Sequence, residues 1–429
     1  MENKVFINRN KRFFSSIWGK LLLLLSVFGP ATITAMADND AGGVATYSIA
    51  GAKLGYPILF LLPIITILLA VTQEMGMRLT IITRRGLADL IRERYGVRAS
   101  VFMFGTLFIA NLGTLMTELS AVKTTSGMFG VPPIPAVIAI VIIAFVLITR
   151  GNYKMTQSIM LFACVFFFVY IFSAVKAKPD WGLALTNLLY PHHDVAVTPL
   201  YLKNYLIIGM GVLGTTITPW GQFFVSSFAF DKKIEKGKVG LSQLETYWGA
   251  FLTDFFSFFM IVATAATLFV NNIVLDSGER AALAIAPFAG KIASQLFAVG
   301  ILNAGFMGLV VVSLSTAYAF AEFFGLSGSL NDSFKESKTF YVLYISQLLL
   351  ATLFVISSNV NLFQIALVTQ IINAIALPLV FYFLINLTSD RDLMGEFTNN
   401  SFQKYFATVG SVVIVLASVF TIAAYFLKL

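Results

Sequence analysis

The chain has 429 residues, of which 58% are hydrophobic and only 12% are charged, and its mean hydropathy is +0.84. Because soluble domains carry about 25% charged residues, this composition excludes a water-soluble globular protein. The apolar segments are continuous runs long enough to span a bilayer as helices, not the short alternating segments of a barrel. We therefore expect an all-α integral membrane protein in a lipid bilayer, with no nucleic-acid partner despite the net charge of +8.

The apolar runs predict eleven transmembrane helices. In chain order they lie at about 20–51, 56–82, 100–124, 133–149, 155–176, 202–230, 244–270, 288–324, 339–358, 360–388 and 404–427. The first, sixth and eighth runs are longer than a bilayer requires, so each is expected to contain a break, to tilt or to extend beyond the membrane.

Lysine and arginine are concentrated in alternate connections, for example at 84–98 and 232–238. Cytoplasmic connections carry such an excess of positive charge. The distribution predicts a multi-pass protein of the cell membrane with a cytoplasmic N-terminus and an extracellular C-terminus. The stretch 84–98 also has the pattern of a short amphipathic helix.

The first apolar run is interrupted by two carboxylates, Asp38 and Asp40, which are followed by Gly42 and Gly43. A charge at the centre of a bilayer costs roughly 2.5–3.5 kcal/mol, so it is retained mainly for function. Glycines are poor helix formers, and we expect the helix to unwind here and expose backbone carbonyls. A carboxylate beside free carbonyls is the outline of a site for a hard cation.

The sixth run is interrupted as well, by Gly214, Pro219 and Gly221. Pro219 has no N–H to bond the carbonyl of Thr215, four residues earlier. Glycine and proline are common in membrane helices, so this feature alone is also compatible with a simple kink. Together, the two breaks lie five runs apart, which is typical of transporters built from inverted repeats. They predict a single transporter domain with a LeuT-like 5+5 inverted repeat, at about 20–176 and 202–388, and an extra helix at 404–427.

Four ordered stretches resemble the NRAMP family of divalent-metal transporters over about residues 28–395. They are GPATITAMADNDAGGVAT, VTQEMGMRLTIITRRGLADLIRERYG, GTTITPWGQFF and TQIINAIALPLVFYFLINLTSDRDLMGEF. In this resemblance Asp40 and Gly43 occupy the aspartate and asparagine positions of the family's DPGN motif, and Gln370 occupies a metal-site glutamine. The resemblance implies a metal site between the broken helices.

The departures from the family pattern bear on the identity of the ion. Thr218 stands in place of a ligating methionine, and Trp220 in place of a histidine. A thioether favours transition metals, so its loss leaves oxygen donors only. The resemblance then implies ligands from Asp40, Gly43, Thr215, Thr218 and Gln370, with Asp38, Trp220 and Asn373 as weaker candidates.

Glycine at position 43 is also expected to enlarge the site, and a larger oxygen-lined site suits Mg²⁺, which keeps several waters. The pattern resembles the NRAMP-related magnesium transporters. It predicts Mg²⁺, and also Mn²⁺, as the transported ion, and no cofactor.

Proton coupling is expected to be weak or absent. The only histidines, His192 and His193, fall in a predicted outer connection, away from the breaks. The third run offers Glu118, but Leu115 stands where the family carries a second carboxylate. We therefore expect alternating access driven mainly by the electrochemical gradient of the ion.

Other polar residues in the runs have simpler interpretations. Glu74 and Arg78, at positions i and i+4, predict a structural ion pair. Asp254 and Glu322 either bond to neighbouring helices or line the ion path. Asn373 lies on the same side of its helix as Gln370 and could hold a water beside it.

Several alternatives stay open at this point. A proton-coupled Mn²⁺/Fe²⁺ importer would use the same architecture, and so would a Na⁺-coupled amino-acid symporter, although Asp40 would repel a substrate carboxylate. A membrane enzyme is disfavoured because the sequence contains no HExxH-type constellation. A passive channel would need residues from several subunits, and the oligomeric state is open.

Overall fold

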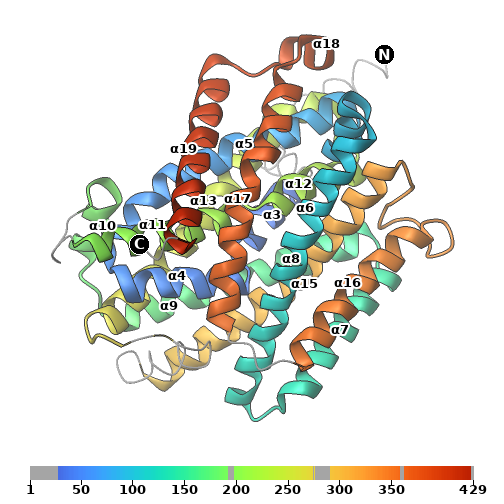
Figure 1. The fold of residues 1–429 in the computed structure, drawn as a ribbon. Coiled ribbons are helices and arrows are strands. Elements are labelled where there is room, and N and C mark those ends of the chain that lie inside the picture. The colour runs from blue at the N-terminus through green and yellow to red at the C-terminus, as the bar shows by residue number, and fades with distance from the viewer. Residues whose placement is uncertain (1–27, 192–197, 274, 276–289, 358–361, 427–429) are drawn as a thin grey trace, which may run out of the picture.

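The computed structural model describes residues 28–191, 198–273, 275, 290–357 and 362–426, and every regular element among them is helical (Figure 1). The α-helices are α3 (Pro30–Ala37), α4 (Ala41–Leu54), α5 (Leu61–Thr83), α6 (Leu87–Thr125), α7 (Pro133–Arg150), α8 (Tyr153–Cys164), α9 (Phe168–Lys176), α10 (Trp181–Leu189), α11 (Pro199–Thr216), α12 (Pro219–Lys232), α13 (Val239–Thr264), α15 (Lys291–Phe324), α16 (Lys338–Ser357), α17 (Leu362–Ser389), α18 (Arg391–Met394) and α19 (Ser401–Phe426). Ten helical runs among the described residues are long and apolar enough to cross a membrane. The pair α3–α4 adds the predicted first span, so the expected all-α membrane fold is confirmed.

Both predicted helix breaks are present. The first separates α3 from α4 at residues 38–40, and the second separates α11 from α12 at residues 217–218. Each helix after a break begins with a side-chain cap: Asp40 Oδ1 accepts from the Gly43 N–H at 2.6 Å, and Thr218 Oγ1 accepts from the Gly221 N–H at 3.0 Å. These caps satisfy N–H groups that the unwound segments cannot pair.

The remaining long runs are continuous. The predicted amphipathic helix and the third span join as α6, which bends at Gly96, where φ is 79°. The long eighth run is the unbroken 34-residue helix α15, so its extra length is an extension and not a break.

The first broken helix, α3–α4, lies inside the bundle (Figure 1). All eight residues of α3 are buried, and every residue of α4 except Lys53 is buried. Helices α13, α17 and α11 pack directly on α4, and α15 packs along α6. Helices α7 and α16 pack against each other at one edge, and α19 packs on the outside of α17.

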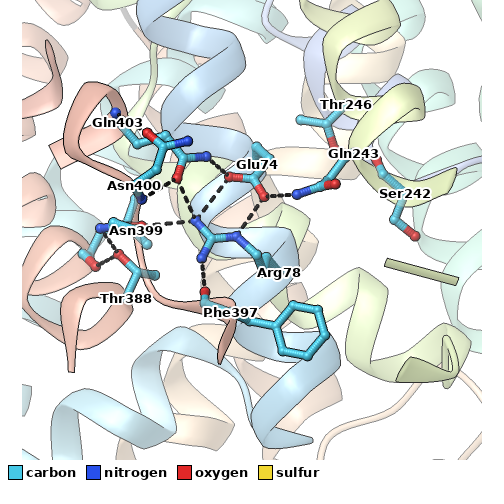
Figure 2. A network of polar contacts seen from close by, with 11 residues as sticks. Glu74, Arg78, Ser242, Gln243, Thr246, Thr388, Phe397, Asn399, Asn400 and Gln403 are labelled. Carbon is cyan, nitrogen blue, oxygen red and sulfur yellow. Dashed lines mark hydrogen bonds and ion pairs between the residues drawn. The ribbon is translucent and has the colours of Figure 1, made fainter. Parts of the chain in front are cut away.

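A buried polar network joins one end of α5 to α13 and to the chain around α19 (Figure 2). The side chains of Glu74 and Arg78 are 0% and 4% exposed, and their Oε1–Nε distance of 2.6 Å confirms the predicted ion pair. Gln243 and Gln403 each donate to Glu74 at 2.8 Å, and Arg78 donates to Asn399 at 2.8 Å. The network therefore anchors the extra helix to the second span.

Candidate metal site at the two helix breaks

Asp40 stands at the start of α4 with one carboxylate oxygen bonded and the other unpartnered. Its Oδ1 caps the helix through Gly43, as described above. Its Oδ2 is buried and has no hydrogen-bond partner among the described residues. Because a buried carboxylate oxygen is costly to leave unpaired, this atom is the strongest candidate ligand for a cation at the break.

Glu118 of α6 reaches the same helix end. Its two carboxylate oxygens accept from the N–H groups of Ala41 at 3.0 Å and Gly42 at 3.4 Å. The ligand set expected from the sequence did not include Glu118. Glu118, like Asp40, is a carboxylate within an apolar run, and this feature of the sequence could have identified it as a site residue.

Asp38 links the two breaks to each other. Thr218 at the second break donates to Asp38 Oδ1 at 2.8 Å, and Gln73 of α5 donates to Asp38 Oδ2 at 3.2 Å. Asp38 is completely buried. It therefore bonds to neighbouring helices in this structure and does not line an open vestibule.

The space at Gly43 is already filled. A Cβ atom at this position would lie 2.9 Å from the carbonyl oxygen of Asp38 and 2.9 Å from Thr215 Oγ1. The expectation that glycine enlarges the site is therefore wrong for this conformation. Glycine instead allows the two breaks to approach closely, and it brings Thr215 beside the backbone of the first break.

Gln370 and Asn373 of α17 form a pair beside the start of α4. Asn373 Nδ2 donates to Gln370 Oε1 at 2.7 Å, as expected for neighbours on one helix face. Gln370 Nε2 is buried and unpartnered within the described residues, and a Cβ atom at Gly42 would lie 2.6 Å from it. The amide nitrogen thus faces α4, so the predicted carbonyl ligand requires rotation of the Gln370 amide by half a turn.

Trp220 contributes bulk behind the second break. Its side chain is completely buried, and its backbone carbonyl accepts from Ser315 Oγ of α15 at 2.8 Å. The indole Nε1 has no partner among the described residues. Trp220 therefore shows no contact that identifies it as an ion ligand.

The other polar residues considered from the sequence have separate partners. Asp254 accepts from Thr66 at 2.5 Å, and Glu322 accepts from Ser227 at 2.6 Å, so both bond to neighbouring helices. His192 and His193 lie outside the described residues.

The charge of the region favours cations. Asp38, Asp40 and Glu118 are each completely buried, and none of them forms an ion pair within the described part of the chain. The helix ends at the breaks are of both kinds: α3 and α11 end there with partially negative carbonyl ends, and α4 and α12 begin there with partially positive amino ends. An anionic substrate would meet repulsion from the three carboxylates.

A helical membrane bundle with two discontinuous helices and a buried polar region between them is the architecture of secondary transporters. Residues 31–424 match the family model described as natural resistance-associated macrophage protein-like, so the chain belongs to the Nramp family. The family predicted from the sequence motifs is thereby confirmed.

Relatives and solved structures agree with this assignment. The divalent metal cation transporter MntH of Levilactobacillus brevis is 24% identical over 421 residues, which cover 93% of this chain and 89% of that protein. The MntH of Lacticaseibacillus casei is 23% identical over 418 residues, with coverage of 93% and 89%. A crystal structure of the Eremococcus coleocola manganese transporter, in a single-site mutant form, shares the fold with a TM-score of 0.75 at 21% identity, covering 96% of this chain and 89% of that one. A Na⁺-coupled sialic acid symporter has the same general fold, with a TM-score of 0.58 at 12% identity and coverage of 92% and 89%.

Proposed function

We propose that this protein transports divalent metal cations, Mg²⁺ foremost and Mn²⁺ as well, across the cytoplasmic membrane by alternating access. The N-terminus faces the cytoplasm and the C-terminus the exterior. The transported ion binds between the two helix breaks. Its ligands are Asp40, the backbone near Gly43, Thr215 and Thr218, with Gln370 joining after its amide rotates.

The observation that carries this proposal is the unpartnered Oδ2 of Asp40 at the first break. That carboxylate oxygen is buried and unpartnered in the described structure, and the position of the family's soft ligand holds the hydroxyl of Thr218. Hard oxygen ligands suit Mg²⁺ and also Mn²⁺, whereas a sulfur ligand would select softer ions.

The described conformation supports a closed, occluded state of the transport cycle. Asp40, Thr215, Thr218 and Gln370 are all 0% exposed. An ion can enter or leave only when the helices around the breaks separate on one side. Such separation on alternate sides is the step that alternating access requires.

Weak or absent proton coupling is part of the proposal. In the described state both oxygens of Glu118 accept backbone hydrogen bonds, which hold the side chain in a capping role at the start of α4. A carboxylate held in this way is poorly placed to release and rebind a proton in each cycle.

A proton-coupled Mn²⁺ importer is the second candidate. It is favoured by the names of the relatives, which are called divalent metal cation transporters, and by the manganese transporter among the structural neighbours. The carboxylates at the breaks would then include the proton-carrying group.

Uptake into proteoliposomes separates the two candidates. Purified protein is reconstituted with a pH dye inside, and Mg²⁺ or Mn²⁺ is added outside without an imposed proton gradient. Entry of Mg²⁺ without internal acidification is the expected result. Entry of Mn²⁺ with acidification, and no entry of Mg²⁺, would overturn the magnesium proposal in favour of the second candidate.

A further inference from the structure

A large apolar cavity lies outside the breaks, between the first half of α5, the short helix α10 and the middle of α13. Its volume is about 560 Å³. The aromatic side chains that line it are Trp181, Phe251, Phe255, Phe258 and Phe259. Trp181 and Phe251 are 37% and 48% exposed, so the cavity opens at the surface of the bundle.

A single carboxylate stands in the wall of this cavity. Asp254 is only 5% exposed, and its Oδ2 accepts from Thr66 at 2.5 Å. Its Oδ1 is buried and has no hydrogen-bond partner among the described residues. Asp254 has no role in the proposed transport cycle. Its unpartnered carboxylate oxygen therefore lies in an apolar, aromatic environment without an assigned function.

The aromatic rings are arranged around one another in edge-to-face contacts. Phe259 lies centrally, with ring centroids 5.0 Å from Phe255, 5.3 Å from Phe258 and 6.2 Å from Trp181. Aromatic faces attract organic cations, and they do so more strongly where water is excluded. A carboxylate beside such rings is the usual chemistry for recognising an ammonium group attached to an apolar body.

We propose that this cavity, which we call the Asp254 cavity, binds an amphiphilic organic cation, that is, a protonated amine carrying an alkyl or aryl body. The ammonium group bonds to the carboxylate of Asp254 after this side chain turns Oδ1 toward the cavity, and the apolar body lies among the aromatic rings. A hydrated metal ion does not fit, since among the described residues that line the cavity only Asp254 and Thr66 carry side-chain oxygen atoms. A neutral lipid tail would leave the Asp254 oxygen buried without a partner.

The Asp254 cavity is also placed to affect the first break. Thr253 and Ser257 lie close to Asp254 in α13, and both bond to Asn39 of the first break. Asn39 Nδ2 donates to the carbonyl of Thr253 at 2.9 Å, and Ser257 Oγ donates to Asn39 Oδ1 at 2.8 Å. A cation bound to Asp254 would therefore stiffen the part of α13 that contacts the unwound segment. If the proposed function is correct, the bound amine slows transport without competing with the metal.

Photolabelling tests the binding itself, without any transport assay. The protein in lipid nanodiscs is exposed to a dodecylamine that carries an alkyl diazirine, irradiated, digested and mapped by mass spectrometry. A dodecanol with the same diazirine serves as the neutral probe. We expect the amine to label residues of α5, α10 and α13 around the Asp254 cavity, and the alcohol to label them about tenfold less, because it lacks the charge.

Two test variants and one control variant make the result decisive. Asp254→Asn keeps the shape of the side chain and should lower amine labelling about tenfold, while Glu322→Gln, at a half-buried carboxylate outside the cavity, should leave it unchanged. Leu185→Trp fills the cavity from α10 without touching the carboxylate, and it should also reduce labelling if Asp254→Asn does not fold. Equal labelling by amine and alcohol, unchanged labelling in Asp254→Asn or Leu185→Trp, or labelling confined to other helices would each overturn the proposal.

Discussion

Replacing Thr218 with valine tests whether the two helix breaks are held together at this residue. Valine keeps the branched shape but removes the hydroxyl that donates to Asp38 at 2.8 Å and accepts from Gly221 at 3.0 Å. The lost hydrogen bond is worth up to about 1.7 kcal/mol inside a membrane protein, and the lost helix cap about 1 kcal/mol. We therefore expect the free energy of unfolding to fall by up to about 2.7 kcal/mol, which shifts the unfolding equilibrium by a factor of up to about 95.

The assay is reversible unfolding in mixed micelles, with dodecyl sulfate as the denaturant and helical circular dichroism as the signal. Thr218→Ser is the matched control, since it retains the hydroxyl and should lie within about 0.5 kcal/mol of the original protein. If valine and serine are equally stable, the hydroxyl does not make these two bonds, and the link between the breaks would have to come from packing alone.

Three further predictions concern the site and the network around α5. Asp40→Asn should abolish metal uptake into proteoliposomes without unfolding the protein, while Glu322→Gln retains uptake; normal uptake by the Asp40 variant would remove this residue from the site. Thr218→Met adds a soft ligand and should shift the uptake preference from Mg²⁺ towards Mn²⁺ or Cd²⁺; unchanged selectivity would show that residue 218 does not contact the ion. Arg78→Met leaves Glu74 buried and without its ion-pair partner, and it should lower the free energy of unfolding by about 3–5 kcal/mol. The control Arg94→Met, at a more exposed pair, should lower it by about 0–1 kcal/mol. Equal losses in the dodecyl sulfate titration would contradict the buried ion pair.

The helices were predictable because their signal is local. The length and hydropathy of a run indicate a membrane span. Residues that cannot continue a helix indicate the breaks. The prediction of a sixth span at 202–230 thus agrees with α11 and α12 together, which cover Pro199 to Lys232. The structure does not test which side of the membrane each terminus faces, so the orientation of the termini stays a prediction.

Side-chain directions at the breaks were not predictable from helical geometry. On an intact helix Asp38 and Asp40 would point about 200° apart. The actual backbone at Asp40 is extended, with φ −60° and ψ 177°, so helical angles no longer relate the two residues. Asp38 consequently meets Thr218, a contact across 180 residues of sequence that no local pattern could indicate.

The contacts of Glu118 and Gln370 were hidden for a related reason. Both depend on which helix packs against α4, and the packing partner is a property of the whole bundle. Glu118 reaches α4 from α6, while Gln370 approaches the same helix from α17. The residue types suggested polar roles, but the choice between capping a helix and binding an ion requires the three-dimensional arrangement.

The hydroxyl of Thr218 links the two breaks and also leaves room for the ion contact that we propose for this residue. A hydroxyl has one proton and two acceptor positions. Its proton is donated to Asp38, and one acceptor position takes the Gly221 N–H, so a second position is left for a cation. Methionine at this position could offer sulfur to the ion but could neither donate to Asp38 nor cap α12. A hard oxygen ligand at residue 218 is therefore coupled to the cohesion of the two breaks, and a change of ion preference there carries a cost in stability.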